Sequence, residues 1–209
     1  MNSYKLEPLE INLTAPNGNY EVTVYIKAHC DTTYNIYSQH RTFVALDKEI
    51  KAGEEQELKF IVSVCDRHFH DAQYEKENGV KISILSDGDI TATAAATTAN
   101  VPTLYICGDS TVTDQPSEYP YYPSSTYCGW GQAFSMLTHD LAVSNHAQSG
   151  SCTKEFMETN LTAFVDKIKP GDFMVIEFGH NDQKLPELDA FGGYAANLEK
   201  LVNIAREKG

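Results

Sequence analysis

Apolar and polar residues alternate along much of the first 85 residues of the chain. The alternating segments are residues 9–13, 22–26, 58–64 and 81–85. A period of two places every second side chain on the same face of a β-strand, so each segment predicts a half-buried strand. Turn signals such as Asn17-Gly18-Asn19 separate these strands, and no convincing helical period interrupts them. The pattern predicts an antiparallel β-sandwich domain over residues 1–100.

The end of this first region is small and polar. Residues 90–100 carry no large apolar side chain after Ile90, and Pro102 follows them. Such a segment is typical of a connection between domains, because it offers little surface to bury. We expect it to close the β-sandwich and to serve as a linker.

The pattern changes after Pro102. Short apolar runs predict strands that are buried on both faces, and between them apolar residues recur every three or four positions, which predicts helices. The runs are residues 104–107, 141–144 and 173–178, and the helical segments are residues 130–141, 157–168 and 194–205. Strands that alternate with helices favour a parallel sheet with right-handed crossovers. Residues 101–209 therefore predict an α/β domain.

The composition is that of a folded protein, since 42% of the 209 residues are hydrophobic and 11% are aromatic. The formal net charge of −13 at pH 7 opposes binding to nucleic acid or to an anionic membrane, so we expect neither as a partner. No apolar stretch approaches the length of a membrane span, and the N-terminus lacks the apolar core of a signal peptide.

The chain contains five cysteines, an odd number with irregular spacing. Reduced thiols in the cytoplasm are the favoured interpretation, although a secreted protein whose signal peptide had been removed would look the same. Cys128 and Cys152 lie in loops where oxidation could pair them. We expect free thiols at both positions.

Each predicted parallel strand ends in a polar loop that contains glycine: the loops carry Ser110, Gly150 and Asn181. The carboxyl ends of parallel strands meet at one edge of a sheet, where ligands bind. These loops would bring together a hydroxyl nucleophile, a glycine N–H that a ligand can approach closely, and a side-chain amide donor. This combination suits acyl transfer, in which backbone and amide N–H groups stabilise an oxyanion.

The motifs in these loops resemble a known family. Gly108-Asp109-Ser110-Thr111, Gly150 and Gly179-His180-Asn181-Asp182 are similar to the first three blocks of the SGNH (GDSL) hydrolases. The longer strings, which add Gly129-Trp130-Gly131-Gln132 and Gln183, resemble the rhamnogalacturonan acetylesterases. The resemblance runs from Leu104 to about Gly209. The preceding strands resemble, less specifically, the β-domain that some bacterial members carry.

The resemblance implies a flavodoxin-like SGNH domain and a serine esterase acting on an acetylated oligo- or polysaccharide, most simply rhamnogalacturonan. Ser110 would be the nucleophile. The backbone N–H groups of Ser110 and Gly150 and the side chain of Asn181 would hold the oxyanion. Asp109 would shape the turn, and neither a metal nor another cofactor is expected.

The chain departs from the family in its base. In the family, the general base and its orienting acid come from a later Asp-x-x-His block, but none occurs after Asn181, and His180 is the last histidine. A serine without a base is not activated. We therefore expect a truncated chain with an incomplete domain, the first three strands only, and an inactive fragment. The open sheet edge would invite association.

Other interpretations of the same residues stay open. A non-catalytic carbohydrate-binding protein, or an SGNH lipase or thioesterase, would also carry this pattern. Trp130 is interpreted either as a sugar platform or as part of the apolar core, and the tyrosines of residues 119–127 either as a sugar platform or as a packed loop. His180 and His146 are expected to be structural.

Overall fold

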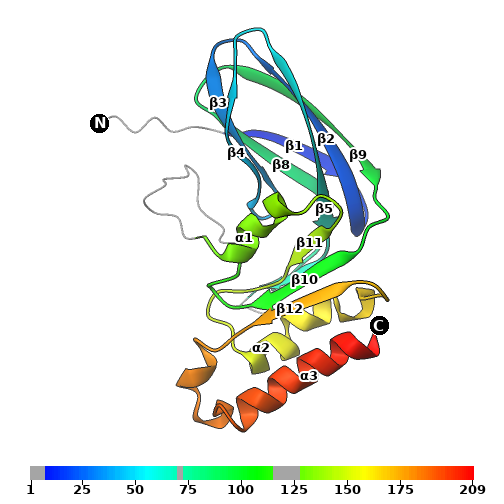
Figure 1. The fold of residues 1–209 in the computed structure, drawn as a ribbon, viewed down its shortest axis with the longest axis vertical. Helices are drawn as coiled ribbons and strands as arrows, with labels where there is room; N and C mark the ends of the chain where they lie inside the picture. The colour runs from blue at the N-terminus through cyan, green and yellow to red at the C-terminus, as the bar shows by residue number, and fades with distance from the viewer. Residues whose placement is uncertain (1–7, 70–72, 115–127) are drawn as a thin grey trace, which may run out of the picture.

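The computed structural model describes residues 8–69, 73–114 and 128–209. Antiparallel sheets form one end of the molecule, and a three-stranded parallel sheet with its helices forms the other (Figure 1). No helix in the described part of the chain is both long enough and apolar enough to cross a membrane.

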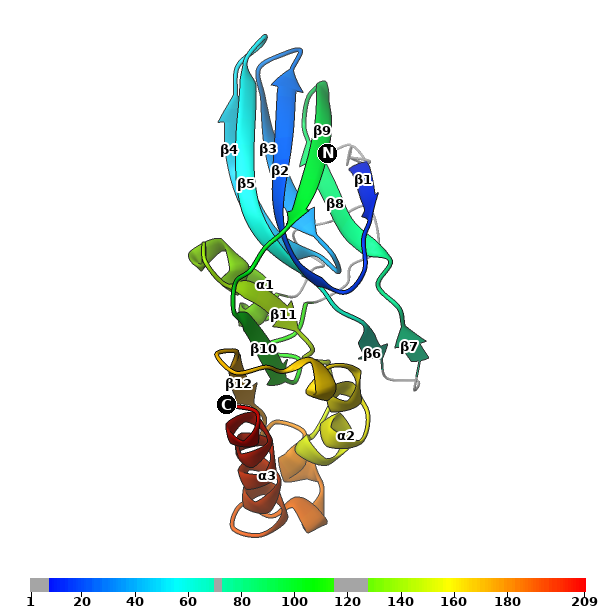
Figure 2. The same cartoon turned by 90° about the vertical axis from the view of Figure 1, so that its right-hand side faces the viewer.

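The N-terminal strands form two antiparallel sheets that face each other across one apolar core (Figure 2). The four-stranded sheet has the order β1 (Leu9–Thr14), β8 (Gly79–Ser86), β3 (Thr32–Ser38), β4 (Thr42–Ile50). The three-stranded sheet has the order β5 (Glu55–Val64), β2 (Gly18–Ala28), β9 (Ile90–Thr98). A short pair, β6 (Arg67–Phe69) and β7 (Gln73–Glu75), extends toward the other end of the molecule.

The alternation along the first region sorts the side chains as expected. On β2, Val22, Val24 and Ile26 are at most 1% exposed, whereas Tyr25 between them is 50% exposed. Ile82 and Ile84 of β8 enter the same core from the opposite sheet. The strands form because each buries one apolar face against the other sheet while its other face stays in water.

Residues 90–100 were expected to close the β-sandwich and to serve as a linker, and the linker part is wrong for residues 90–98. These residues form β9, which pairs with β2 along its whole length, from Tyr20 opposite Thr98 to Ala28 opposite Ile90. Small side chains suffice here because the backbone hydrogen bonds hold the strand, and the inward-facing alanines pack against the core. The connection to the second part is shorter, residues 99–102.

The three predicted parallel strands are confirmed. Their order is β11 (Ala142–Asn145), β10 (Thr103–Gly108), β12 (Phe173–Glu177), and both pairings are parallel. All six residues of the central strand β10 are buried. The helix α1 (Trp130–Phe134) packs on one face of the sheet, and α2 (Thr153–Glu158) and α3 (Gly193–Glu207) pack on the other (Figure 1).

Two predicted helices are shorter than expected. The segment from residue 130 is α1 followed by a 3₁₀ turn (Ser135–Leu137), and Leu137 is 76% exposed rather than buried in an apolar stripe. The segment after α2 continues only as 3₁₀ turns, Asn160–Ala163 and Val165–Lys167. Two further 3₁₀ turns, Asp182–Lys184 and Pro186–Leu188, precede α3, which agrees with the predicted last helix.

Asn160 follows the second helix. Its side-chain amide donates to the carbonyl oxygens of His68 (3.0 Å) and His146 (3.2 Å) and to Oε1 of Gln148 (2.8 Å). Asn160 is 2% exposed, so these bonds satisfy a buried polar group. They hold Asn160 at the start of the 3₁₀ turn Asn160–Ala163, just after α2 ends at Glu158.

Hydrogen bonds from both ends of the molecule meet at Asp114, which is 5% exposed. Its carboxylate accepts from Oγ1 of Thr42 in β4 (2.7 Å) and from Nδ2 of Asn145 in β11 (2.9 Å). The guanidinium of Arg67 in β6 lies 3.6 Å from the same carboxylate and donates to the carbonyl oxygen of Asn145. The two parts therefore share a buried polar interface, and the division at residue 100 stays a prediction.

Further bonds extend this interface. Gln132 of α1 donates to the carbonyl oxygen of Arg41 (2.7 Å), and Asn19 of β2 donates to Oγ1 of Thr103 in β10 (2.9 Å). Gln132 is fully buried. Separation of the two parts would break all of these hydrogen bonds. This separation would be costly in free energy, because buried polar groups are expensive to leave unpaired.

Removal of the partners of Asp114 should destabilise the protein. Thr42→Val keeps the side-chain shape and removes one donor, and we expect it to lower the free energy of unfolding by about 1–3 kcal/mol. Asp114→Ala also leaves the Arg67 guanidinium without its carboxylate, and we expect a loss of about 3–5 kcal/mol. Urea unfolding followed by circular dichroism measures both.

The matched control is Thr93→Val, because Thr93 is exposed on β9. We expect this change to alter the free energy of unfolding by less than about 0.5 kcal/mol. Losses at Thr42 and Asp114 no larger than this control would contradict a structural role for the interface.

His146 is buried between the parallel sheet and the turns that follow α2. It is 3% exposed, its ring centroid lies 4.2 Å from that of Phe164, and its Nε2 is 2.9 Å from Oγ of Ser144. Burial lowers the pKa of His146 well below its ordinary value, and the positive charges of Arg67 and Lys167 lower it further. The expectation that His146 is structural fits this position.

The buried neutral imidazole predicts loss of stability in mild acid. The unfolded state takes up a proton below a pKa of about 6.5 while the folded state does not, so stability is present above that pH and lost below it. We expect a loss of about 1 kcal/mol as pH falls from 6.5 to 5.5, with a slope that approaches about 1.4 kcal/mol per pH unit at lower pH. His146→Gln should flatten this dependence in urea unfolding, and an unchanged slope would contradict the assignment.

Candidate active site

The three loops predicted to carry the site follow neighbouring parallel strands at their carboxyl ends. Ser110 follows β10, Gly150 follows β11 and Asn181 follows β12. Two bonds tie the loops together: the N–H of Gln148 donates to the carbonyl oxygen of Gly108 (3.0 Å), and Nδ2 of Asn181 donates to the carbonyl oxygen of Ser151 (2.9 Å). The edge of the sheet therefore holds the loops side by side.

Ser110 is exposed in a tight turn that Asp109 organises. Oδ1 of Asp109 accepts from the N–H of Thr111 at 3.0 Å and lies 3.0 Å from the hydroxyl oxygen of the same residue. The carbonyl oxygen of Asp109 accepts from the N–H groups of Val112 and Thr113, both at 3.1 Å. Asp109 is 1% exposed, so its carboxylate shapes the turn from inside while the serine faces solvent. We call residues 109–114 the Ser110 turn.

Gly150 adopts a backbone conformation that favours glycine. Its φ is +85°, in the left-handed region where a Cβ is strained. The residue is exposed, and the bond from the N–H of Ser151 to the carbonyl oxygen of Gln148 (3.2 Å) closes the turn around it. The absence of a side chain lets a ligand approach the backbone here.

The carboxamide of Asn181 is held at both ends. Nδ2 donates to Ser151 as described, and Oδ1 accepts from Nζ of Lys184 at 2.8 Å. The two bonds fix which end of the amide is the donor. An amide group has two N–H hydrogens, and among the described residues one of them serves Ser151, so the other can serve an oxyanion.

Asp182, the next residue, locks the third loop to the helices below. Its Oδ1 accepts from the N–H of Thr153 at 2.9 Å, at the start of α2. Asn197 of α3 donates to Oγ1 of Thr153 at 3.0 Å. Asp182 is 1% exposed. Sequence reasoning gave this residue no role of its own, although it stands in the same motif as Asn181.

Glu177 is a second residue that sequence reasoning missed. It ends β12, and its two carboxylate oxygens accept from the hydroxyl of Thr111 (2.6 Å) and from Nε1 of Trp130 (2.7 Å). The available signal was its position as the single charged residue in an apolar run. It connects the Ser110 turn to α1.

His180 lies at the edge of the site. Its side chain is 67% exposed, and its Nδ1 is 4.0 Å from Oδ2 of Asp109. All five cysteines are free thiols, as expected, and Cys128 and Cys152 are not paired. The tyrosine segment, residues 119–127, lies outside the described residues. The described part of the chain contains no cluster of three His, Cys, Asp or Glu residues that could hold a metal ion.

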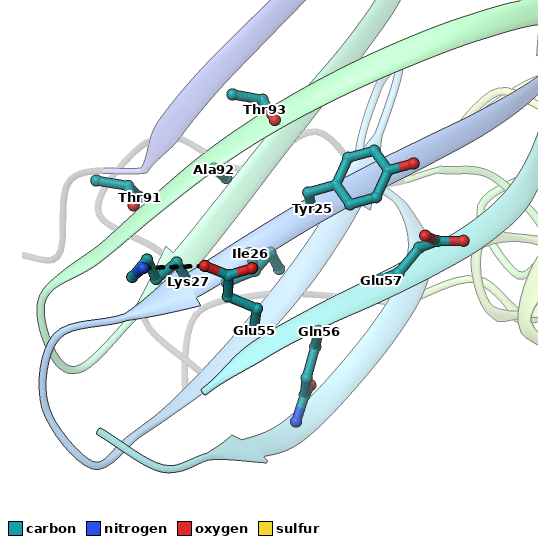
Figure 3. Close-up of a pocket in the computed structure, with 9 residues that line it drawn as sticks. All are labelled: Tyr25, Ile26, Lys27, Glu55, Gln56, Glu57, Thr91, Ala92 and Thr93. Atoms are coloured by element: carbon teal, nitrogen blue, oxygen red, sulfur yellow. Dashed lines mark hydrogen bonds and ion pairs between the residues drawn. The ribbon is translucent and has the colours of Figure 1, made fainter. Parts of the chain in front are cut away.

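A separate hollow of about 530 Å³ lies on the outer face of the β5-β2-β9 sheet (Figure 3). Tyr25 lines it, and an ion pair of 2.9 Å joins two further lining residues, Lys27 and Glu55. Its lining contains no serine, cysteine or histidine. The hollow therefore contains none of the candidate residues Ser110, Gly150 and Asn181.

Comparisons with known proteins relate the chain to esterases, although no protein-family model matches it. It is 37% identical to the rhamnogalacturonan acetylesterase RhgT of Bacillus subtilis over 108 residues, 51% of this chain and 44% of that protein. It is 27% identical to the uncharacterized esterase YxiM of the same organism over 210 residues, 95% of this chain and 50% of that protein.

The crystal structure of YxiM aligns with 96% of this chain and 54% of that chain, with 23% identity and a TM-score of 0.46. The chain spans about half the length of the curated relatives it matches. The sequence similarities and the motifs at the edge of the sheet agree with each other. The chain is thus similar in sequence to rhamnogalacturonan acetylesterases, and its loops carry motifs that resemble those of the SGNH hydrolases.

Proposed function

We propose that the whole protein is a serine esterase that removes acetyl groups from rhamnogalacturonan or a related acetylated pectic saccharide. The observation that supports the proposal is that Ser110, Gly150 and Asn181 each follow one of three neighbouring parallel strands at the same edge of the sheet. The similarity to a rhamnogalacturonan acetylesterase supports the choice of substrate. The geometry alone supports acyl transfer.

In this mechanism the hydroxyl oxygen of Ser110 attacks the acetyl carbonyl carbon, and the sugar oxygen leaves with a proton. The N–H groups of Ser110 and Gly150 and the amide of Asn181 donate to the oxyanion that forms. Water then hydrolyses the acetyl ester on Ser110 and releases acetate. The bonds from Asn181 to Ser151 and Lys184 hold its amide in place before the substrate arrives.

The mechanism also needs a general base. In the family the base comes from an Asp-x-x-His block, and residues 1–209 contain no such block after Asn181. We propose that the three parallel strands are the first strands of a flavodoxin-like SGNH domain that follows a β-sandwich domain. A histidine and an acid from outside residues 1–209 would then complete the site. The protein would act in the cytoplasm, or outside the cell if it is exported.

Substitutions at the three loops test the proposal in the whole protein. We expect Ser110→Ala to abolish acetate release from acetylated rhamnogalacturonan, and Asn181→Ala to lower kcat by roughly a hundred- to a thousand-fold because one oxyanion donor is lost. Gln183→Ala, an exposed neighbour, is the control and should leave kcat within about twofold.

Acetate release that survives Ser110→Ala would contradict the proposed nucleophile. A p-nitrophenyl butyrate rate well above the p-nitrophenyl acetate rate would favour a lipase or thioesterase. Saccharide binding without hydrolysis in the whole protein would favour a non-catalytic binding protein.

Residues 1–209 by themselves should release acetate only at a negligible rate, because they contain no Asp-x-x-His block after Asn181 to supply the family's general base. The measurement is acetate release by the purified chain at micromolar concentration, compared with its Ser110→Ala variant. Turnover that depends on Ser110 and is lost in His180→Ala would contradict this expectation and would make His180 the base.

A further inference from the structure

Trp130 begins α1 immediately beside the Ser110 turn. Its backbone N–H donates to the carbonyl oxygen of Thr111 at 2.9 Å. The glycines on either side allow this approach: a Cβ on Gly129 would lie 2.4 Å from the carbonyl oxygen of Thr113, and one on Gly131 would lie 2.4 Å from that of Val112. Real Cβ atoms do not come so close to backbone oxygens. The Gly-Trp-Gly string thus places the tryptophan against the turn that presents Ser110.

The indole ring is fixed by a charged partner. Glu177 accepts from Nε1 of Trp130 at 2.7 Å, and the same carboxylate accepts from the hydroxyl of Thr111 at 2.6 Å. Hydrogen bonds to ionised acceptors are roughly twice as strong as neutral ones. One carboxylate therefore holds the indole edge and the residue next to Ser110 in a single arrangement.

The held ring is not buried. Trp130 remains 36% exposed, and on one side its ring meets Phe134 edge to face, with centroids 5.9 Å apart. A large apolar ring at the surface gains less from burial than a core residue, so core packing alone does not account for its fixed orientation. Core packing therefore accounts only for the side of the Trp130 indole ring that contacts Phe134.

The chemistry of this surface fits a sugar ring. The C–H face of a pyranose is apolar and stacks on an indole, while its hydroxyls need polar partners around the ring. The exposed carboxylate of Glu177 and the hydroxyl of Thr111 lie directly beside the indole. With a net charge of −13 and two carboxylates near Ser110, those of Asp109 and Glu177, the surface favours a neutral sugar over a uronate at this position.

We propose that the indole of Trp130 is a stacking subsite for a neutral sugar residue next to Ser110, and that Glu177 is its positioning residue. The subsite rests on the proposed function, because it states where the saccharide lies while Ser110 attacks its acetyl group. A ring fixed before binding loses little freedom when the sugar arrives, which raises affinity.

The test uses the fact that Trp130 is the single tryptophan of the chain. We expect purified residues 1–209, titrated with acetylated rhamnogalacturonan oligosaccharides, to show a saturable change in tryptophan emission. In isothermal titration calorimetry, Trp130→Ala should weaken binding at least about tenfold. Trp130→Phe keeps an aromatic face and should stay within about threefold of the wild-type affinity.

Variants of Glu177 separate positioning from a merely structural role. Glu177→Ala removes both bonds, so the emission of the free chain should shift to the red and binding should weaken about three- to tenfold. Glu177→Gln can still accept from the indole and donate to Thr111, so it should restore both readouts. Far-ultraviolet circular dichroism checks that each variant is folded.

Two exposed aromatic residues outside the Ser110 turn, α1 and β12 are the matched controls. Phe191 is 99% exposed before α3, and Tyr25 lines the sheet hollow of Figure 3. Phe191→Ala and Tyr25→Ala should leave the affinity unchanged. Loss of binding in Tyr25→Ala with full binding in Trp130→Ala would overturn the proposal and place the sugar on the sheet. The absence of saturable binding would also overturn it.

The outcomes distinguish this proposal from the esterase assignment. Oligosaccharide binding that depends on Trp130, together with no acetate release by the whole protein, would support the subsite and contradict the esterase. Acetate release with the same KM in Trp130→Ala would support the esterase and overturn the subsite.

Discussion

The buried carboxylate of Asp114 is the interaction on which the arrangement of this protein most depends. It closes the Ser110 turn and accepts hydrogen bonds from Thr42 of the antiparallel strands and from Asn145 of the parallel sheet. Arg67 balances its charge and reaches the backbone of the same Asn145. A buried charge is tolerated only with such partners. The antiparallel strands thus contribute directly to the surroundings of the candidate nucleophile.

The candidate site follows from the topology of the parallel sheet. Because β10 is central and its neighbours run in the same direction, the loops after all three strands lie at one edge. Each loop is held by a buried carboxylate or amide: Asp109 in the first, Asn145 in the second and Asp182 in the third. The residues that contact these loops are polar but buried, while Ser110 and Gly150 remain exposed.

The sequence predicted the local features and missed the distant ones. The alternation of apolar and polar residues and the short apolar runs located most strands. Gly150 has a positive φ, which is a local property that a glycine in the sequence can indicate. The extent of β9 was not predicted because its alanines are held by pairing with β2. The short length of the second helix was not predicted because the residues after it are held by distant contacts, such as the bond from Asn160 to His68, 92 residues away. The pairing of Glu177 with Trp130 joins residues 47 positions apart, which no periodicity reports.

The central claim is that Ser110 is the activated oxygen at the edge of the parallel sheet. Its most direct test is covalent labelling of the whole protein with a fluorophosphonate ester, followed by peptide mass spectrometry, because only an activated serine with an oxyanion site reacts quickly. The account predicts one adduct per molecule, on Ser110, and much slower labelling in Asn181→Ala. A rapid adduct on any other residue, or an unmodified Ser110 in active protein, would contradict it.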